Sequence, residues 1–128
     1  MIELICLVIG SVLGGVARYI VSAIVARRYG ETFPWGTLII NVTGAFLIGI
    51  FGARGTHDVS LLAQPAPWLF AVTGFLGCYT TVSSFSLQTL ILAHDGKMRS
   101  ALGNVVGSVG LSLAAVTAGF ILTEWLGG

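Results

Sequence analysis

Residues 35–53 read WGTLIINVTGAFLIGIFGA and contain no charged side chain. A helix needs about 20 apolar residues, at a rise of 1.5 Å each, to cross a hydrocarbon core of about 30 Å. Three more apolar runs of that length lie around this one: Ile2 to about Ala26, Trp68 to Ala93, and Ser100 to Thr123. We therefore predict an all-α membrane protein with four transmembrane helices, in a single domain spanning residues 1–128.

The composition of the whole chain agrees with this prediction. Only 9% of the residues are charged and 55% are hydrophobic, whereas a soluble domain carries roughly a quarter charged residues. The formal net charge of +1 provides no field that would attract a nucleic acid. We expect a multi-pass protein of the inner (plasma) membrane with no nucleic-acid partner.

Several functional classes lack the residues that they would need. The sequence has no nucleophile–base pair, no Walker loop and no metal-binding motif, so we do not expect an enzyme. Cys6 and Cys78 lie inside apolar runs and read as small packing residues. A proton-coupled exporter normally needs a titratable group inside the membrane. Glu3 and Glu124 are both near the chain ends, which counts against a small multidrug-type exporter.

The third apolar run contains an unusual polar segment. Residues 73–86 read TGFLGCYTTVSSFS, with two glycines followed by consecutive hydroxyl and β-branched residues. Such a composition disfavours a continuous helix. An unwound segment at membrane depth survives only where it is buried in protein or lines a cavity, and its freed carbonyls can bind a cation. We predict a break near the middle of the third helix; the alternative is a helix merely kinked at glycine.

Polar residues also lie inside the other three helices, where each is a functional candidate. Arg18 either anchors its helix by reaching water or a backbone carbonyl, or lines an anion vestibule. Asn41 either joins two helices or offers its amide hydrogens to an anion. Asn104, Ser108 and Ser112 recur every fourth residue, so they share one helix face and form a polar stripe.

Glycine is frequent within the helices. The chain has 18 glycines, and small residues allow membrane helices to approach closely. We expect tight helix packing and an oligomer. The helical glycines are Gly10, Gly14, Gly15, Gly44, Gly49, Gly74, Gly77, Gly103, Gly107 and Gly110.

The loops differ in charge. The first and third loops carry Arg27, Arg28, Lys97 and Arg99, whereas the second loop and the termini carry only Arg54. Because basic loops tend to stay in the cytoplasm, this distribution favours an orientation with both termini outside.

Taken in order, these motifs resemble the Fluc (CrcB) family of fluoride channels over nearly the whole chain. The matching residues are Gly14-x3-Arg18, Asn41-x2-Gly44, the run from Gly77 through Thr80-Thr81-x-Ser83-Ser84-Phe85-Ser86, and the Ser108/Ser112 stripe. The resemblance implies a dual-topology protein whose two subunits pair antiparallel. It also implies passive export of fluoride through pores at the dimer interface, which lowers cytoplasmic fluoride and confers resistance.

The resemblance further assigns roles to individual residues. A structural sodium ion at the dimer interface would be held by the backbone carbonyls of Gly77 and Thr80, and Arg18 would face the anion vestibule. The fluoride pore would be lined by Asn41, Thr81, Ser83, Ser84, Phe85, Ser108 and Ser112.

Three positions differ from the family's pattern. Val82 stands where the family has a phenylalanine, Cys78 where glycine is usual, and Gln88 where a carboxylate is common. The loss of one ring at position 82 has three explanations: a tolerated natural variant, an engineered substitution, or a subunit whose partner supplies the missing ring. We expect an antiparallel homodimer. The alternatives are a subunit that conducts only as a heterodimer and a non-conducting accessory subunit.

Overall fold

The structure is a computed structural model that describes residues 1–56 and 60–127. Its described part is helical and contains four helices long and apolar enough to cross a membrane: Ile2–Tyr29, Trp35–Gly55, Pro65–His94 and Met98–Gly127. The prediction of an all-α, four-span membrane protein is therefore confirmed. Three spans are single helices, namely α1 (Ile2–Tyr29), α2 (Trp35–Gly55) and α6 (Met98–Gly127).

The third span is composite. A short 3₁₀ turn, η1 (Leu61–Ala63), leads into α3 (Pro65–Trp68), where proline occupies the first helical turn and its missing amide donor matters least. A π-helical segment, η2 (Leu69–Leu76), and one short turn, α4 (Gly77–Tyr79), follow. The span resumes as α5 (Val82–His94) after an interruption.

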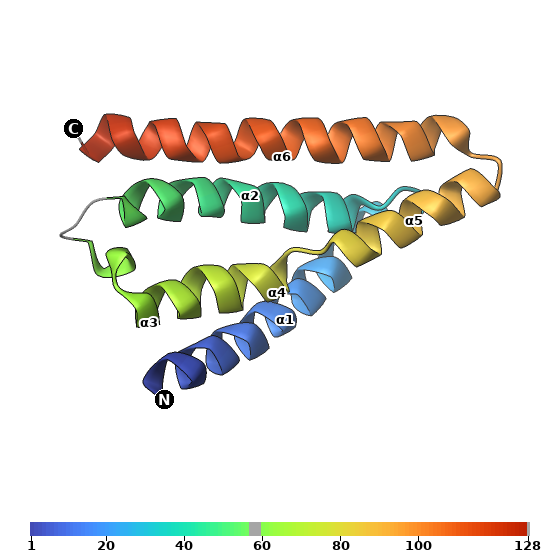
Figure 1. Cartoon of the computed structure of the whole chain (residues 1–128). Helices are drawn as coiled ribbons and strands as arrows, with labels where there is room; N and C mark the ends of the chain where they lie inside the picture. Colours follow the sequence, from blue (N-terminus) through green and yellow to red (C-terminus); the bar gives the residue numbers. More distant parts are fainter. Residues whose placement is uncertain (57–59, 128) are drawn as a thin grey trace.

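The helices pack as two pairs, α2 with α6 and α1 with the first half of the third span (Figure 1). The cartoon shows α2 alongside α6, with α1 crossing the first half of the third span and α5 extending toward the start of α6. The most buried apolar cluster comprises Ile40, Leu76 and Tyr79. It lies where α2 meets the third span, next to the interruption.

Glycine makes the close helix contacts possible, as predicted. A Cβ on Gly49 of α2 would collide with the Val116 backbone of α6, and a Cβ on Gly119 would collide with the Phe46 backbone. Gly10 and Gly14 likewise bring α1 against the backbone of η2. On α6, by contrast, no described residue lies within 4 Å of the Cβ position of Gly103, Gly107 or Gly110.

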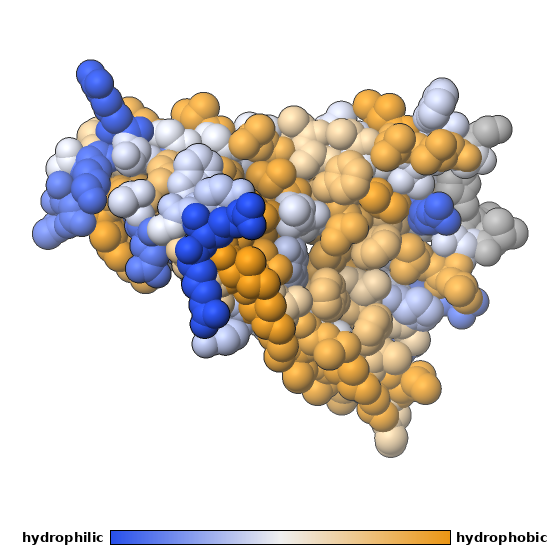
Figure 2. Space-filling view, turned by 180° about the vertical axis from the view of Figure 1, so that it is seen from behind, coloured by the Kyte–Doolittle hydropathy of each residue, from blue (hydrophilic) through white to orange (hydrophobic). Residues whose placement is uncertain are grey.

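The surface is apolar over the length of the spans and polar at one end. Large apolar side chains such as Val12, Ile20 and Leu113 are about half exposed or more, and Figure 2 shows hydrophobic side chains covering much of one face. Lipid is as apolar as these side chains, so a bilayer would accommodate such an outer surface. Hydrophilic side chains gather at the end formed by the α1–α2 and α5–α6 loops (Figure 2). The orientation expected from these loops stays a prediction.

Gly49 and Gly52 provide a matched test of the packing between α2 and α6. Gly49→Ala should lower the free energy of unfolding by about 1–3 kcal/mol, because the added methyl group meets a backbone that cannot yield. Gly52→Ala should change that free energy by less than about 0.5 kcal/mol, because no described residue lies within 4 Å of the Gly52 Cβ position. Denaturation in mixed detergent micelles measures both; equal effects would contradict the packing described.

Candidate functional site

The third span is interrupted at Thr80 and Thr81. Helix α4 ends at Tyr79 and α5 begins at Val82, and between them Thr80 has a ψ of 160° and Thr81 has a φ of −151° and a ψ of 124°. These are extended conformations, which consecutive β-branched residues favour. The predicted break is therefore present. It is confined to two residues, because Gly77, Cys78 and Tyr79 are still helical.

Asn41 of α2 satisfies the backbone at this break. Its Oδ1 accepts a hydrogen bond from the Thr81 N–H at 2.8 Å, and its Nδ2 donates to the Thr81 carbonyl at 2.9 Å. Unpaired backbone groups are costly at membrane depth because no water can replace the lost helical partner. The Asn41 amide thus provides the acceptor and the donor that a continuous helix would have supplied to the Thr81 backbone. As a consequence, the Gly77 carbonyl loses the N–H that a continuous helix would direct at it.

Hydroxyl groups organise the start of α5. The Thr81 Oγ1 accepts a hydrogen bond from the Ser84 N–H at 3.2 Å, which is the arrangement of a helix N-cap. The same oxygen lies 3.1 Å from the Ser83 Oγ and 3.3 Å from the Ser84 Oγ. Three predicted pore residues therefore form one hydroxyl cluster at the break.

Arg18 of α1 also points to the break. Its Nη1 lies 3.5 Å from the Thr80 carbonyl oxygen, at the limit of a hydrogen bond, so the guanidinium reaches a backbone carbonyl, as one of the two sequence hypotheses proposed. The Thr80 side chain packs directly against Gly44 of α2. A larger residue at position 44 would prevent this contact, because its Cβ would collide with the Thr80 Cγ2.

A groove beside the break brings five of the predicted pore residues together: Asn41, Thr81, Phe85, Ser108 and Ser112. Its volume is about 320 Å³, and it runs between α2, the start of α5 and α6. Thr80 and Val82 also line it, together with the apolar side chains Ala45, Ile48 and Val109.

The other predicted site residues lie around the groove. Ser83 and Ser84 do not line it, but their hydroxyls bond Thr81, which does. Arg18 approaches the break through the Thr80 carbonyl. Val82 lines the groove with 77% of its surface exposed, so this one of the three positions that differ from the family's pattern faces outward from the chain.

Two polar contacts that join helices were not predicted from the sequence. The Thr43 and Tyr79 hydroxyls are 3.0 Å apart and connect α2 to α4. The buried Asn104 donates from its Nδ2 to the Thr89 Oγ1 at 2.8 Å and accepts from the Ser108 hydroxyl at 3.2 Å. The i, i+4 spacing of Thr81, Phe85 and Thr89 could have placed Thr89 on the groove side of α5.

The groove contains neutral hydrogen-bond donors. None of its lining residues is ionisable. The Ser112 hydroxyl makes no hydrogen bond with any residue of the described ranges, and the Asn41 amide has a second N–H beyond the one donated to Thr81. The fold and the groove together define a small protein with four helices that could cross a membrane and with a neutral, hydroxyl-bearing groove beside the break in the third.

Comparison with known proteins gives the family. The chain matches the family described as "CrcB-like protein, Camphor Resistance (CrcB)" over residues 5–120, and it belongs to this family. It is 72% identical over 124 residues to "Fluoride-specific ion channel FluC 2" of Bradyrhizobium diazoefficiens, covering 97% of this chain and 90% of the relative.

Two further relatives carry similar names. "Fluoride-specific ion channel FluC 2" of Rhodopseudomonas palustris is 59% identical over 112 residues, covering 88% of this chain and 86% of the relative. "Fluoride-specific ion channel FluC" of Opitutus terrae is 50% identical over 113 residues, with the same coverage of 88% and 86%.

Replacing Asn41 tests its role at the break. Asn41→Leu should lower the free energy of unfolding by about 2 kcal/mol or more, because it leaves the Thr81 N–H and carbonyl unpaired. Thr117→Val is the control. The Thr117 hydroxyl is on the exposed side of α6 and bonds only the Leu113 carbonyl of its own helix, so its loss should matter by less than about 0.5 kcal/mol. Equal stability of the two variants in micelles would exclude a bracing role for Asn41.

Proposed function

We propose that this chain is a fluoride-selective ion channel that passively exports fluoride across the inner membrane and so lowers cytoplasmic fluoride. The observation that carries the proposal is the neutral groove at the broken span, in which Asn41, Thr81, Phe85, Ser108 and Ser112 meet. Membership of the CrcB family, with relatives named as fluoride-specific channels, supports it. A channel needs no catalytic residue.

The groove has the chemistry that fluoride requires. Fluoride is small and strongly hydrated, so a narrow path must replace its water with hydrogen-bond donors. The free hydroxyl of Ser112 and the second amide hydrogen of Asn41 can do this without a full positive charge that would trap the ion. The edge of the Phe85 ring carries partial positive charge and offers a weaker contact to an anion.

An antiparallel homodimer would complete the path. The groove is open on one side within a single chain, and the largely exposed Val82 lies beside it. A second copy of the chain placed over this opening would enclose the ion and shield the polar residues from lipid. The alternative is a differently oriented partner subunit that supplies an aromatic ring opposite Val82. The excess of basic residues in the first and third loops supports that alternative.

The break also fits a structural sodium ion. We propose that the carbonyls of Gly77 and Thr80 would hold it at the subunit interface. The Thr81 N–H donates to Asn41 instead of to the Gly77 carbonyl, so the Gly77 oxygen can accept from or coordinate another group. The Thr80 carbonyl receives only a long contact from Arg18, at 3.5 Å. A bound cation would supply positive charge that offsets the desolvation of a nearby anion.

Flux measurements on this chain alone test the proposed function. Liposomes reconstituted with the wild-type chain should lose fluoride rapidly, as measured with a fluoride electrode, while chloride loss stays at the level of empty liposomes. Absence of fluoride loss from folded protein would reject a homomeric channel. In that case, Val82→Phe in the same assay separates two causes of the missing flux. Fluoride loss from the variant would assign the cause to the missing ring at position 82, and no fluoride loss would assign it to a missing partner subunit.

Ser112 and Thr117 provide a matched pair for the path itself. Both are hydroxyl residues of α6, but only Ser112 lines the groove. Ser112→Ala should lower the fluoride efflux rate by about tenfold, the equivalent of one hydrogen bond to an anion. Thr117→Val should leave the rate unchanged. Equal rates for the wild type and Ser112→Ala would exclude Ser112 from the ion path.

A further inference from the structure

A chain of hydrogen bonds joins α5 to α6 beside the groove. The Thr89 hydroxyl donates to the Phe85 carbonyl at 2.7 Å, and the Asn104 Nδ2 donates to the Thr89 Oγ1 at 2.8 Å. The Ser108 hydroxyl in turn donates to the Asn104 Oδ1 at 3.2 Å. Asn104 is fully buried. Phe85 and Ser108 line the groove, whereas Thr89 and Asn104 do not.

The direction of this chain is fixed from its α5 end. A backbone carbonyl can only accept, so the one hydroxyl proton of Thr89 is used at Phe85 and the Thr89 oxygen is left to accept. Asn104 must therefore turn its NH2 group to Thr89, which leaves its Oδ1 facing Ser108. Because an amide oxygen can only accept as well, Ser108 must donate. The one proton of the Ser108 hydroxyl thus points at Asn104 and not into the groove.

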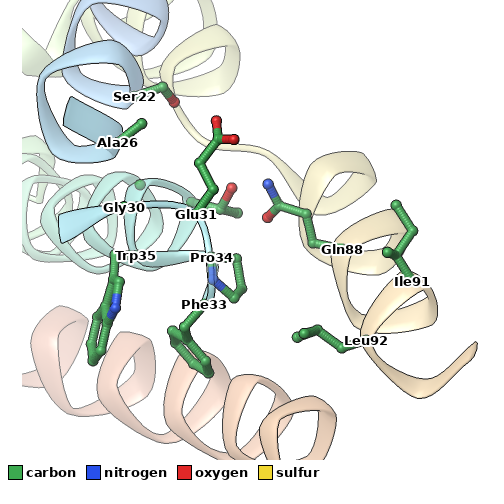
Figure 3. Close-up of a pocket in the computed structure, with 12 residues that line it drawn as sticks. Ser22, Ala26, Gly30, Glu31, Phe33, Pro34, Trp35, Gln88, Ile91 and Leu92 are labelled. Atoms are coloured by element: carbon green, nitrogen blue, oxygen red, sulfur yellow. The ribbon is translucent and has the colours of Figure 1, made fainter. Parts of the chain in front are cut away.

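The chain of hydrogen bonds lies apart from the other polar cavity that α5 borders. Gln88 and Leu92 of α5 line a cavity of about 250 Å³, which Figure 3 shows beside the loop between α1 and α2. That cavity shares no lining residue with the groove, and neither Thr89 nor Asn104 lines it. Of these two spaces, the hydrogen-bond chain therefore reaches the groove alone, at Ser108.

The two serines of the groove consequently differ in what they offer to an anion. The Ser112 hydroxyl makes no hydrogen bond with any residue of the described ranges, so its proton is free to turn into the groove. The Ser108 oxygen, whose proton is committed to Asn104, presents lone pairs to the groove. Lone pairs repel an anion, so Ser108 opposes an anion until its hydroxyl turns.

We infer that Asn104 is a positioning residue that holds the Ser108 hydroxyl away from the ion, and that this hydroxyl turns from the Asn104 Oδ1 to fluoride as the ion passes. The inference rests on the proposed function. Each turn gives up one hydrogen bond between neutral groups, because the Asn104 oxygen is buried and has no other described donor. Asn104 thereby slows the passage of fluoride at Ser108, while Ser112 provides a donor without such a loss.

Fluoride efflux from liposomes distinguishes this role from a structural one. Asn104→Leu removes the acceptor and frees the Ser108 proton, so the efflux rate should rise about fivefold over the wild type, the equivalent of one neutral hydrogen bond. A residue that merely stabilised the fold would lower the rate when replaced. The increase should vanish when both proteins also carry Ser108→Ala, because no hydroxyl is then left to release.

Thr89 provides a second variant, which leaves both ends of the Ser108–Asn104 contact in place. Thr89→Val removes the oxygen that fixes the amide, so Asn104 can take either orientation and the efflux rate should rise by a smaller factor, about twofold. Thr89→Ser is the matched control, because it retains the hydroxyl and should conduct at the wild-type rate. Rates at or below the wild-type rate in folded Asn104→Leu and Thr89→Val would overturn the inference.

A spectroscopic measurement follows the hydroxyl directly. Asparagine occurs in this chain at positions 41 and 104 alone, so labelling asparagine side chains with ¹⁵N gives one amide signal from each in a nuclear magnetic resonance spectrum. Sodium fluoride should move the Asn104 signal toward its position in Ser108→Ala, where Asn104 likewise lacks the serine donor. Sodium chloride at the same concentration should not. An Asn104 signal that fluoride leaves unmoved, whether or not the Asn41 signal moves, would overturn the inference.

The two measurements separate this inference from the proposed function. Movement of the Asn104 signal by fluoride, without fluoride efflux from the wild type, would reject the channel and retain the turn of the Ser108 hydroxyl. Fluoride efflux from the wild type with an unmoved Asn104 signal would retain the channel and reject the inference.

Discussion

The pairing of the Asn41 amide with the Thr81 backbone is the interaction on which the rest of the site depends. Inside a bilayer, a backbone N–H or carbonyl that loses its helical partner finds no water with which to form a hydrogen bond. At the interruption of the third span, the Asn41 side chain of α2 offers Thr81 an acceptor at 2.8 Å and a donor at 2.9 Å.

The break in turn builds the groove. It lets Thr81 cap α5 and gathers the Ser83 and Ser84 hydroxyls around one oxygen. It also faces the polar side of α6, where Asn104 holds Ser108 in place from a fully buried position. Glycine allows these parts to meet, because Thr80 occupies the space that a side chain on Gly44 would fill. Buried polar side chains such as Asn104, Ser108 and Thr81 therefore lie beside a small apolar core of Ile40, Leu76 and Tyr79.

Much of this arrangement could be predicted from the sequence, because the relevant signals are local. Uncharged runs give the four spans, the hydroxyl-rich segment after Gly77 gives the break, and four-residue spacing puts Ser108 and Ser112 on one face. The partners of these residues could not be predicted, because periodicity gives a face of a helix and not what lies opposite. Contacts between helices determine the pairing of Asn41 with the Thr81 backbone and the contact of Thr89 with Asn104. They also leave the Gln88 Oε1 without a hydrogen-bond partner among the described residues. For the same reason Gly49 has a tight contact, while Gly103 has none with the residues that the structure describes.

The central claim is that a neutral, hydroxyl-lined path at the break conducts fluoride and rejects larger anions. The most direct test is the reversal potential of the purified chain in a planar bilayer, with a tenfold fluoride gradient and equal chloride on both sides. The account predicts a reversal potential of about 59 mV in magnitude, the value for a monovalent ion crossing alone. A reversal potential near zero under the fluoride gradient, or one that moves when a chloride gradient is imposed instead, would contradict it.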